Sequence, residues 1–314
     1  MKKYKLLFIT LILISINSYA QQWKRFRYEA IVGIGGTNFL GELGGANRQG
    51  TNFVRDLEIS MTRPLINVAL RYQINQQFSF KPSLTYGLLR GDDKTTKEMY
   101  RNYRNLSFRS PILEFSTQLE YWPIKEQFKG SRYSLKRKKS LQAFGKVNSV
   151  QIYPYFFAGV SVFYFNPKTK YNGKWYALQP LGTEGQGLLP TRKKYKRVQM
   201  SIPYGIGFKY PITRRMMIGL EYGVRKTFTD YIDDVSTTYY DQKLLTQGRG
   251  TIASRLADRS DPNNPDVDLY SKTHPNWTDA NQQRGDSRDK DSYMFLIVNL
   301  IYKLNTSVRG IPKF

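Results

Sequence analysis

The sequence has no cysteine and only one histidine among its 314 residues. Without cysteine there are no disulfides, thiolate metal sites or iron–sulfur clusters, and one histidine leaves little scope for histidine-based catalysis. Acidic residues are also few, since 24 Asp and Glu face 49 Lys and Arg, for a formal charge of +25. We therefore expect a strongly basic protein that is not an enzyme and needs no cofactor.

Long apolar runs are missing beyond the N-terminus, so no helical membrane span is expected. The first residues are typical of a secretion signal, with a cationic start at Met1–Lys5, the apolar run Leu6–Ile16, and small residues at Ser18 and Ala20. That run is too short for a membrane anchor. We expect residues 1–20 to be a signal peptide cleaved near Ala20 and residues 21–314 to form one domain.

The abundant tyrosine, phenylalanine and glycine favour strands and tight turns. In residues 63–74 the even positions are mostly apolar and the odd positions mostly polar, which is the period of a strand with one apolar face. The same alternation recurs, more weakly in the first and fourth cases, in residues 28–36, 78–88, 110–122, 152–165, 200–210, 216–225 and 292–304. We therefore predict eight strands, with short turns at residues 75–77 and 211–214.

Alternation alone fits either a soluble sandwich or a membrane barrel. Three features favour the barrel: strands of about 9 to 13 residues, connections that alternate between short and long, and aromatic residues near strand ends, as in Tyr121–Trp122, Tyr164–Phe165 and Tyr210. The predicted fold is all-β, an eight-stranded antiparallel transmembrane barrel in the outer membrane of a Gram-negative cell.

Charged residues occupy the polar face of these strands, which is the inside of a barrel. Because side chains fill the interior of an eight-stranded barrel, we expect these groups to form a structural ion network and the barrel not to conduct. The residues are Glu29, Arg71, Lys81, Glu114, Glu120, Lys209, Glu221, Arg225 and Lys303.

With both termini in the periplasm, the strand count places residues 37–62, 91–108, 167–198 and 230–290 outside the cell. The connector 123–149 then faces the periplasm and is long and basic. It is either a solvated charge run or a docking segment for a periplasmic partner or an acidic polymer. The candidate partner-binding residues are Lys129, Arg132, Lys136, Arg137, Lys138 and Lys139.

The outer loop 167–198 is also basic. An exported basic protein rarely meets nucleic acid, so lipid and lipopolysaccharide phosphates are the expected counter-charges; no small-molecule substrate is expected. The candidate contacts are Arg192, Lys193, Lys194, Lys196 and Arg197. The loop 230–290 holds 11 of the 24 acidic residues and is either mobile or a recognition surface.

Asp230, Asp233 and Asp234 place three carboxylates close together in the sequence, as an oxygen-ligated calcium site requires. The spacing is not that of an EF-hand, so capping and turn roles are the alternative. The glycines of residues 33–36 are best explained by a tightly curved strand. His274 lies beside Pro275 in the long outer loop, which argues against a histidine-dependent membrane enzyme.

Four segments are similar to those of a known family: Gly35–Leu43, Arg104–Ser110, Pro180–Gly187 and Asp230–Ser236. They resemble the PorG-like outer-membrane proteins associated with the type IX secretion system. The resemblance implies a barrel that contacts the periplasmic ring of lipoprotein and partner subunits, while cargo passes through a separate, larger translocon. It also leaves open a paralogue that acts as a surface-binding or adhesive barrel through its long outer loops.

Overall fold

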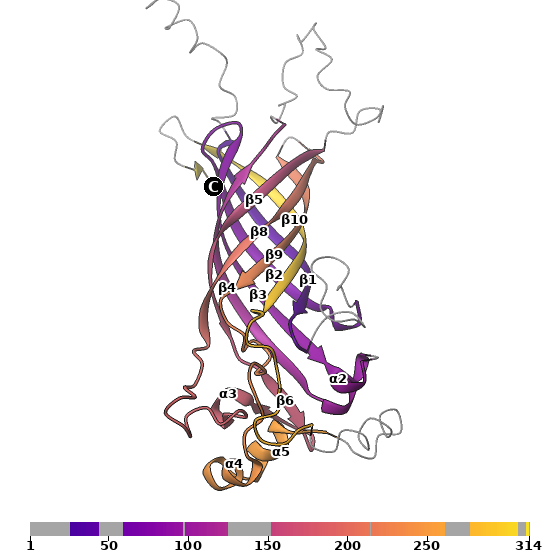
Figure 1. Ribbon diagram of the computed structural model, residues 1–314. Helices are drawn as coiled ribbons and strands as arrows, with labels where there is room; N and C mark the ends of the chain where they lie inside the picture. Colours follow the sequence, from indigo (N-terminus) through magenta and orange to yellow (C-terminus); the bar gives the residue numbers. More distant parts are fainter. Residues whose placement is uncertain are drawn as a thin grey trace, which may run out of the picture.

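The computed structural model describes residues 26–43, 59–96, 98–124, 152–213, 215–260, 277–306 and 312–313. Eight long strands form one antiparallel barrel (Figure 1). They are β1 (Tyr28–Leu40), β2 (Arg63–Gln73), β3 (Phe78–Asp92), β4 (Ser107–Tyr121), β5 (Tyr153–Phe165), β8 (Val198–Pro211), β9 (Met216–Thr227) and β10 (Ser292–Thr306). The first strand pairs with the last, from Tyr28 opposite Leu304 to Leu40 opposite Ser292, so the barrel is closed. The predicted fold class is confirmed.

The outward face of the barrel is apolar and uncovered. Val32 is 57% exposed and Ile34 is 67% exposed, and the same face of every other strand carries aliphatic or aromatic side chains that are more than a third exposed. An apolar surface of this extent is stable only against hydrocarbon. The soluble sandwich is therefore excluded, and the molecule is a barrel of the outer-membrane type.

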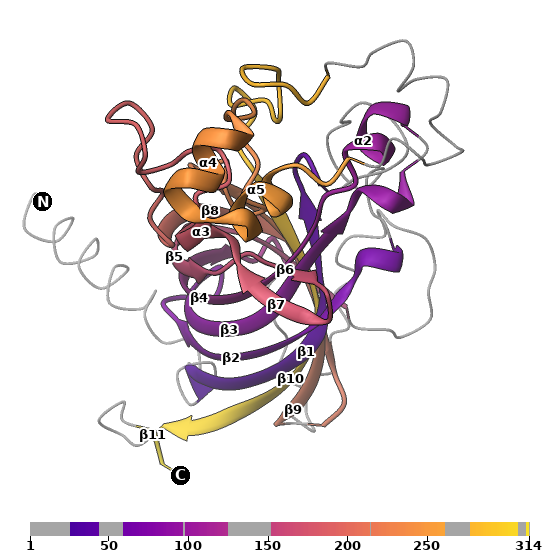
Figure 2. The same cartoon turned by 90° about the horizontal axis from the view of Figure 1, so that it is seen from below.

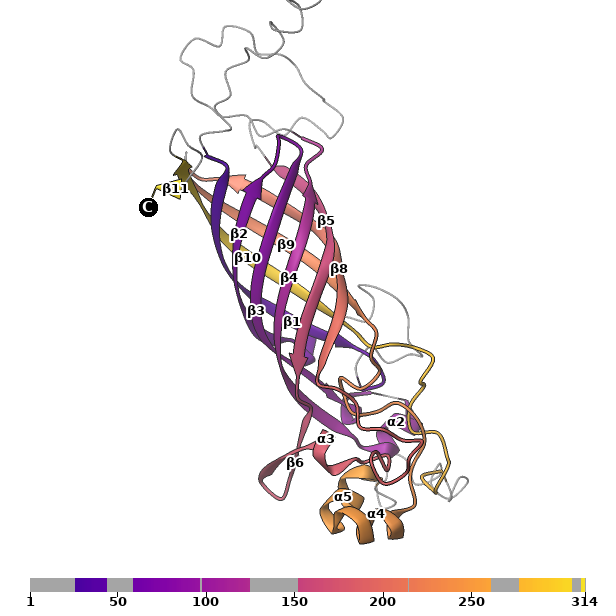
Figure 3. The same cartoon turned by 90° about the vertical axis from the view of Figure 1, so that its left-hand side faces the viewer.

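Short turns and aromatic pairs mark one end of the barrel. Residues 74–77, between β2 and β3, form a tight connection there, and β8 and β9 are joined at the same end by only a few residues. Tyr28 packs on Tyr72 with ring centroids 5.0 Å apart. By the rule that short turns face the periplasm, this is the periplasmic end, and aromatic rings at the lipid boundary are typical of it. The end of β10 lies at this end too (Figure 3), where the short strand β11 (Pro312–Lys313) pairs with it.

The opposite end carries a folded cap built from the outer loops (Figure 2). It is here called the outer cap and comprises residues 41–43, 93–96, 98–106, 166–197, 228–260 and 277–291. Its regular elements are η4 (Asp93–Thr95), α2 (Met99–Arg104), the hairpin β6 (Lys168–Tyr171) and β7 (Lys174–Ala177), α3 (Leu178–Leu181), α4 (Gln242–Arg249) and α5 (Thr251–Ala257); η3 (Ile59–Met61) precedes β2. No helix in the described ranges has the length and apolar character needed to cross a membrane.

Several strands are longer than predicted at this outer end. The first strand, predicted to stop at residue 36, continues to Leu40, and β3 and β4 extend to Asp92 and back to Ser107. In the extension of β1 the alternation is lost because the cap buries the consecutive residues Thr37, Asn38 and Phe39, whereas the extensions of β3 and β4 keep it. The predicted loops 37–62 and 91–108 are therefore wrong at these boundaries.

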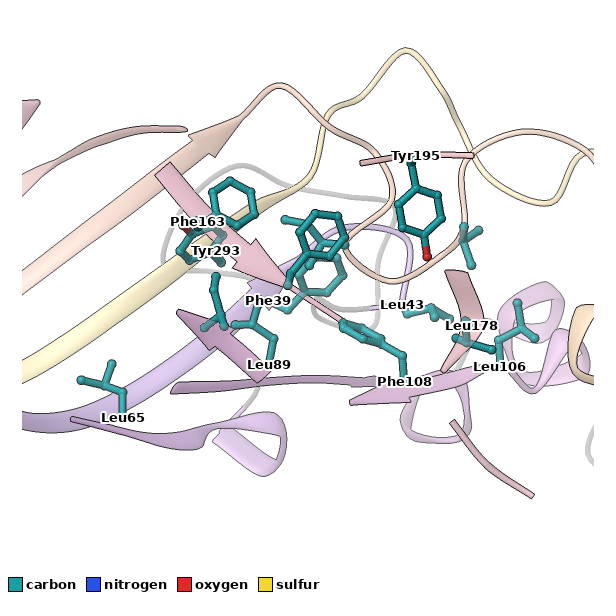
Figure 4. Packing of buried hydrophobic residues seen from close by; sticks show 14 of the residues in the cluster. Phe39, Leu43, Leu65, Leu89, Leu106, Phe108, Phe163, Leu178, Tyr195 and Tyr293 are labelled. Carbon is teal, nitrogen blue, oxygen red and sulfur yellow. The ribbon is translucent and has the colours of Figure 1, made fainter. Parts of the chain in front are cut away.

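A hydrophobic cluster fills the barrel just beneath the outer cap (Figure 4). Its aromatic rings pack edge to face: the ring centroids of Phe163 and Tyr293 are 5.4 Å apart, and those of Phe39 and Phe108 are 4.9 Å apart. The buried members include Phe39, Leu43, Leu65, Leu89, Leu106, Phe108, Ile112, Phe163, Phe165, Tyr195, Tyr293 and Phe295. This cluster, the outer plug, ties the cap to the barrel.

The glycines near the start of the chain have a packing role. A Cβ atom on Gly35 would lie 1.9 Å from the backbone oxygen of Leu296 on β10. Any side chain there would push β1 away from the strand that closes the barrel.

Candidate functional site

The interior of the barrel holds the nine charged residues predicted for it, and none is more than 4% exposed. Arg71 lies between two carboxylates: its Nη1 is 2.7 Å from Glu29, and its Nε and Nη2 donate to the two oxygens of Glu120 at 2.6 and 2.9 Å. The register explains part of this, because Glu29 stands opposite Arg71 on β2 and opposite Lys303 on β10. A paired carboxylate and guanidinium are stable in such a dry site only with this geometry.

Three further ion pairs cross the lumen. Lys81 on β3 pairs with Glu221 on β9, and Lys209 on β8 lies 2.9 Å from Glu29 on β1. Arg225 on β9 lies 3.4 Å from Glu114 on β4. In each of these three ion pairs, the two strands that carry the partners are not neighbours in the sheet. The network therefore holds opposite walls of the barrel together.

Aromatic rings occupy much of the remaining interior toward the periplasmic end. Trp122 and Tyr155 pack with centroids 4.4 Å apart, and the Arg71 guanidinium lies 5.1 Å from the Trp122 ring. The Tyr155 hydroxyl donates to Glu221 at 2.8 Å. The ion network lies in the middle of the barrel between these rings and the outer plug, so charged and aromatic side chains occupy the interior along its length.

At the outer end, a polar centre lies inside the cap, around Glu184 and Arg284. The Glu184 carboxylate accepts hydrogen bonds from the Ser236 and Thr237 backbone N–H groups at 2.9 and 3.2 Å and from the Thr237 hydroxyl at 2.7 Å. It also lies 3.0 Å from Arg284, and both side chains are buried. One carboxylate thus fixes the loop after α3, the loop after β9 and the loop before β10.

Arg284 extends this centre through two carbonyl groups. Its guanidinium donates to the backbone oxygens of Asp234 at 2.6 Å and Ala257 at 3.2 Å. Burial alone would lower the pKa of Arg284, but the adjacent Glu184 and Asp234 outweigh burial and raise it. Arg104 then donates to the Arg284 carbonyl at 2.7 Å and pairs with buried Asp93 at 2.8 Å.

Asp234 is held by two hydroxyl groups. Thr183 and Tyr195 donate to its two oxygens at 2.5 and 2.7 Å. Burial raises the pKa of Asp234 to about 6, against the lowering effect of Arg284. The side chain thus fills a structural acceptor role, which was the alternative to metal binding.

A separate acidic cluster comprises Glu42, Asp230 and Asp291, one oxygen of each lying within 4.8 Å of the others. Burial, with the neighbouring Asp230, raises the pKa of Glu42 to about 8; burial, with Asp233, raises the pKa of Asp230 to about 8. Within the described ranges no lysine or arginine forms an ion pair with any of the three. Arg104 and Lys290 lie close enough to lower the pKa of Glu42 and Asp230, respectively, but burial and the neighbouring carboxylates outweigh them.

Asp230, Asp233 and Asp234, the predicted metal group, do not converge on a single point. Only Asp230 belongs to the acidic cluster. Asp233 turns its two oxygens to the backbone N–H groups of Leu43 and Val235. Residues adjacent in a tight loop point in different directions, and the missing partners come from segments far away in the sequence.

Comparison with known proteins gives a family for the chain. Residues 3–253 match a family model described as "Domain of unknown function (DUF6089)". This chain belongs to the DUF6089 family. No curated protein matches the sequence.

Solved structures similar to this DUF6089 protein are bacterial barrels. Neisserial surface protein A is 9% identical (TM-score 0.38; 88% of this chain, 96% of that chain). The attachment invasion locus protein Ail of Yersinia pestis is 8% identical (TM-score 0.35; 88% and 98%). The N-terminal β-barrel domain of Pseudomonas aeruginosa OprF is 9% identical (TM-score 0.32; 88% and 98%). These likenesses are distant, and the barrel of the DUF6089 protein rests on its own strand pairing.

Most residues of the polar centre and of the acidic cluster in this DUF6089 protein were not predicted from the sequence. Glu42, Arg104 and Glu184 fall within the segments that resemble PorG-like proteins, so those segments contained a signal without showing which residues would meet. Arg284 and Asp291 lie in a loop with no recognisable pattern, and nothing local to them indicated burial.

The predicted surface cations of the outer loop divide into two groups. Arg192 points into the cap, donating to the Glu184 carbonyl at 2.6 Å and the Thr238 hydroxyl at 2.8 Å, while Arg197 lies 5.6 Å from the ring of Tyr164. Lys193, Lys194 and Lys196 are exposed. The predicted connector residues and His274 lie outside the described residues, as does the predicted signal peptide.

Proposed function

We propose that this DUF6089 protein is a non-enzymatic outer-membrane scaffold of a type IX-like secretion machinery, and that it contacts the periplasmic ring through the connector 123–149. The observation that carries the proposal is the filled interior: the ion pairs of Arg71 and Lys81 and the packed Trp122 occupy the space that cargo would need. Such a barrel works at its ends. The periplasmic end is where the two ends of the basic connector enter the barrel, at β4 and β5.

The resemblance to PorG-like proteins supports the same role. All four similar segments contribute buried residues to the outer cap, namely Leu43, Arg104, Glu184 and Asp230. In that family the barrel contacts ring lipoproteins, and cargo uses another translocon. The basic connector supplies charge that an acidic face of a ring subunit would match.

Affinity purification of the tagged full-length protein from mild-detergent outer membranes tests the proposal. We expect ring lipoproteins to be identified by mass spectrometry with the wild type and to be lost when Lys136, Arg137, Lys138 and Lys139 are changed to Ser. A matched control changes the exposed outer lysines Lys193, Lys194 and Lys196 to Ser, which should leave recovery unchanged. Equal recovery with the connector variant would contradict the docking role.

A second candidate is a surface-binding or adhesive barrel, and the folded outer cap favours it. The described part of the loop 230–290 is not a bare chain but contains α4 and α5, packed through buried Leu245, Ala253 and Ala257. An ordered cap with exposed lysines can present a fixed surface to lipopolysaccharide or a host polymer. Deleting residues 245–285 would then abolish surface binding and leave secretion intact, the opposite of the result expected for the scaffold.

A further inference from the structure

The acidic cluster of Glu42, Asp230 and Asp291 has the arrangement of a cation site. In two of the three carboxylates, one oxygen is held by a backbone N–H and the other has no partner. The Asp286 N–H donates to Glu42 Oε1 at 2.8 Å, leaving Oε2 without a hydrogen bond. The Ile232 N–H donates to Asp291 Oδ2 at 2.8 Å, leaving Oδ1 without one.

Asp230 is the decisive member of the cluster. It is 3% exposed, and within the described part of the chain neither of its carboxylate oxygens has a partner at hydrogen-bond distance and angle, although the Ser236 side chain lies close enough to lower its pKa. Asp291, with its own free oxygen, is 1% exposed. Burying carboxylate oxygens without a donor or a counter-charge is strongly unfavourable. Four such oxygens together indicate a positively charged group between them.

We propose that Glu42, Asp230 and Asp291 bind a calcium ion that joins three loops of the outer cap to the barrel. One oxygen of each carboxylate lies within 4.8 Å of the others, which suits an ion with ligand distances of about 2.3–2.6 Å, because oxygens on opposite sides of it are about 4.6–5.2 Å apart. Magnesium, at about 2.0–2.1 Å, requires a tighter and strictly octahedral set.

The backbone leaves room for this arrangement. Gly41 lies against the cluster, and a Cβ atom there would stand 2.3 Å from the free Asp291 Oδ1. Asp233 lies close enough to act electrostatically on Asp230 and Asp291, so it adds a further carboxylate beside the cluster. The N–H groups that fix Glu42 and Asp291 orient their free oxygens in advance, which reduces the cost of binding.

The location gives the ion a structural role. Glu42 follows β1, Asp230 follows β9, and Asp291 immediately precedes β10. β10 lies between β1 and β9 in the sheet, so a single ion would clamp the outer ends of three adjacent strands at the barrel closure. Extracellular calcium modules bind with dissociation constants of about 10⁻⁴–10⁻³ M, and we expect this site to fall in that range.

Isothermal titration of the EDTA-treated, refolded full-length protein with calcium chloride tests the proposal. We expect one saturable site for the wild type, binding magnesium at least ten-fold more weakly, and slower proteolysis of the cap in calcium than in EDTA. Asp230→Asn should weaken calcium binding at least ten-fold, whereas Asp289→Asn, at an exposed position of the same cap, should bind as the wild type does.

Folding of each variant is checked by its heat-modifiable migration on gels. If Asp230→Asn does not fold, the wild-type measurements decide: no saturable calcium binding at millimolar concentrations and identical proteolysis in calcium and EDTA would overturn the proposal. Unchanged calcium affinity in a folded Asp230→Asn variant would overturn it as well.

Discussion

Lys81 and Glu221 stand on strands β3 and β9, which face each other across the barrel, and their side chains form an ion pair in its interior. Tyr155 donates to the same carboxylate, and Lys81 also lies 3.5 Å from Glu120. The pair therefore belongs to a continuous network that crosses the lumen and rigidifies the barrel wall.

Changing Lys81 to Met should destabilise the barrel by about 3–5 kcal/mol, because it leaves the buried Glu221 charge without its cation. The double variant Lys81→Met, Glu221→Gln should lose much less than the sum of the single variants, since no unpaired charge remains. Urea unfolding in detergent micelles, followed by gel migration, measures both. Lys226→Met, at an exposed lysine of β9, is the control; strictly additive effects would contradict the pairing.

The filled interior predicts a barrel that does not conduct. Purified protein inserted into planar lipid bilayers should show no stable single-channel currents, because ion pairs and aromatic rings occupy the lumen. Stable unitary currents from the folded wild type would show that a continuous water path exists and would remove the main argument for a scaffold.

The strands could be predicted because one physical constraint acts along their whole length. Lipid on one side and a packed polar interior on the other force the alternation seen from Ile66 to Ile74. That constraint ends where the cap begins, and there the predicted end of the first strand was wrong: Asn38 and Phe39 point to opposite faces of the strand, and both are buried.

The cap could not be predicted, because its contacts join residues far apart in the sequence. Glu184 and Arg284 are separated by 100 positions and meet only when α3 and the loop before β10 fold over the same barrel end. In the same way the carboxylate of Asp230 lies beside those of Glu42 and Asp291, which come from distant parts of the chain. The local run of aspartates in the sequence could not show these distant neighbours.

Replacing Arg284 with Met should loosen the outer cap without unfolding the barrel. The change removes the ion pair to Glu184 and the bonds to the Asp234 and Ala257 carbonyls, leaving buried acceptors unsatisfied at a cost of about 1–3 kcal/mol each. Limited proteolysis should cut near α4 and α5 several-fold faster, with unchanged heat-modifiable migration. Arg288→Met, at an exposed position, should leave the cleavage rate at the wild-type value.

The stability of the cap should depend on pH through Asp234. Burial raises its pKa from 3.8 to about 6, so the folded state binds this proton more tightly than the unfolded state. Protonation of Asp234 therefore contributes about 3 kcal/mol to the stability of the cap. This contribution is complete below about pH 4 and is lost as the pH rises to about 6.

Asp234→Asn cannot titrate, so the difference in cap unfolding between it and the wild type, measured by denaturant-dependent proteolysis between pH 4 and 7, isolates this group. The wild type should lose stability relative to the variant as the pH rises across that window. A difference that is constant with pH would contradict the raised pKa.

The scaffold role is tested most directly by photo-crosslinking in living cells, with a photoreactive amino acid placed either at Lys138 in the basic connector or at Lys193 in the outer loop. We expect a crosslink from position 138 to a periplasmic ring lipoprotein, and no crosslink from position 193 to the same lipoprotein. Crosslinks from position 193 to a surface partner, with none from position 138, would contradict the scaffold and assign the function to the outer cap.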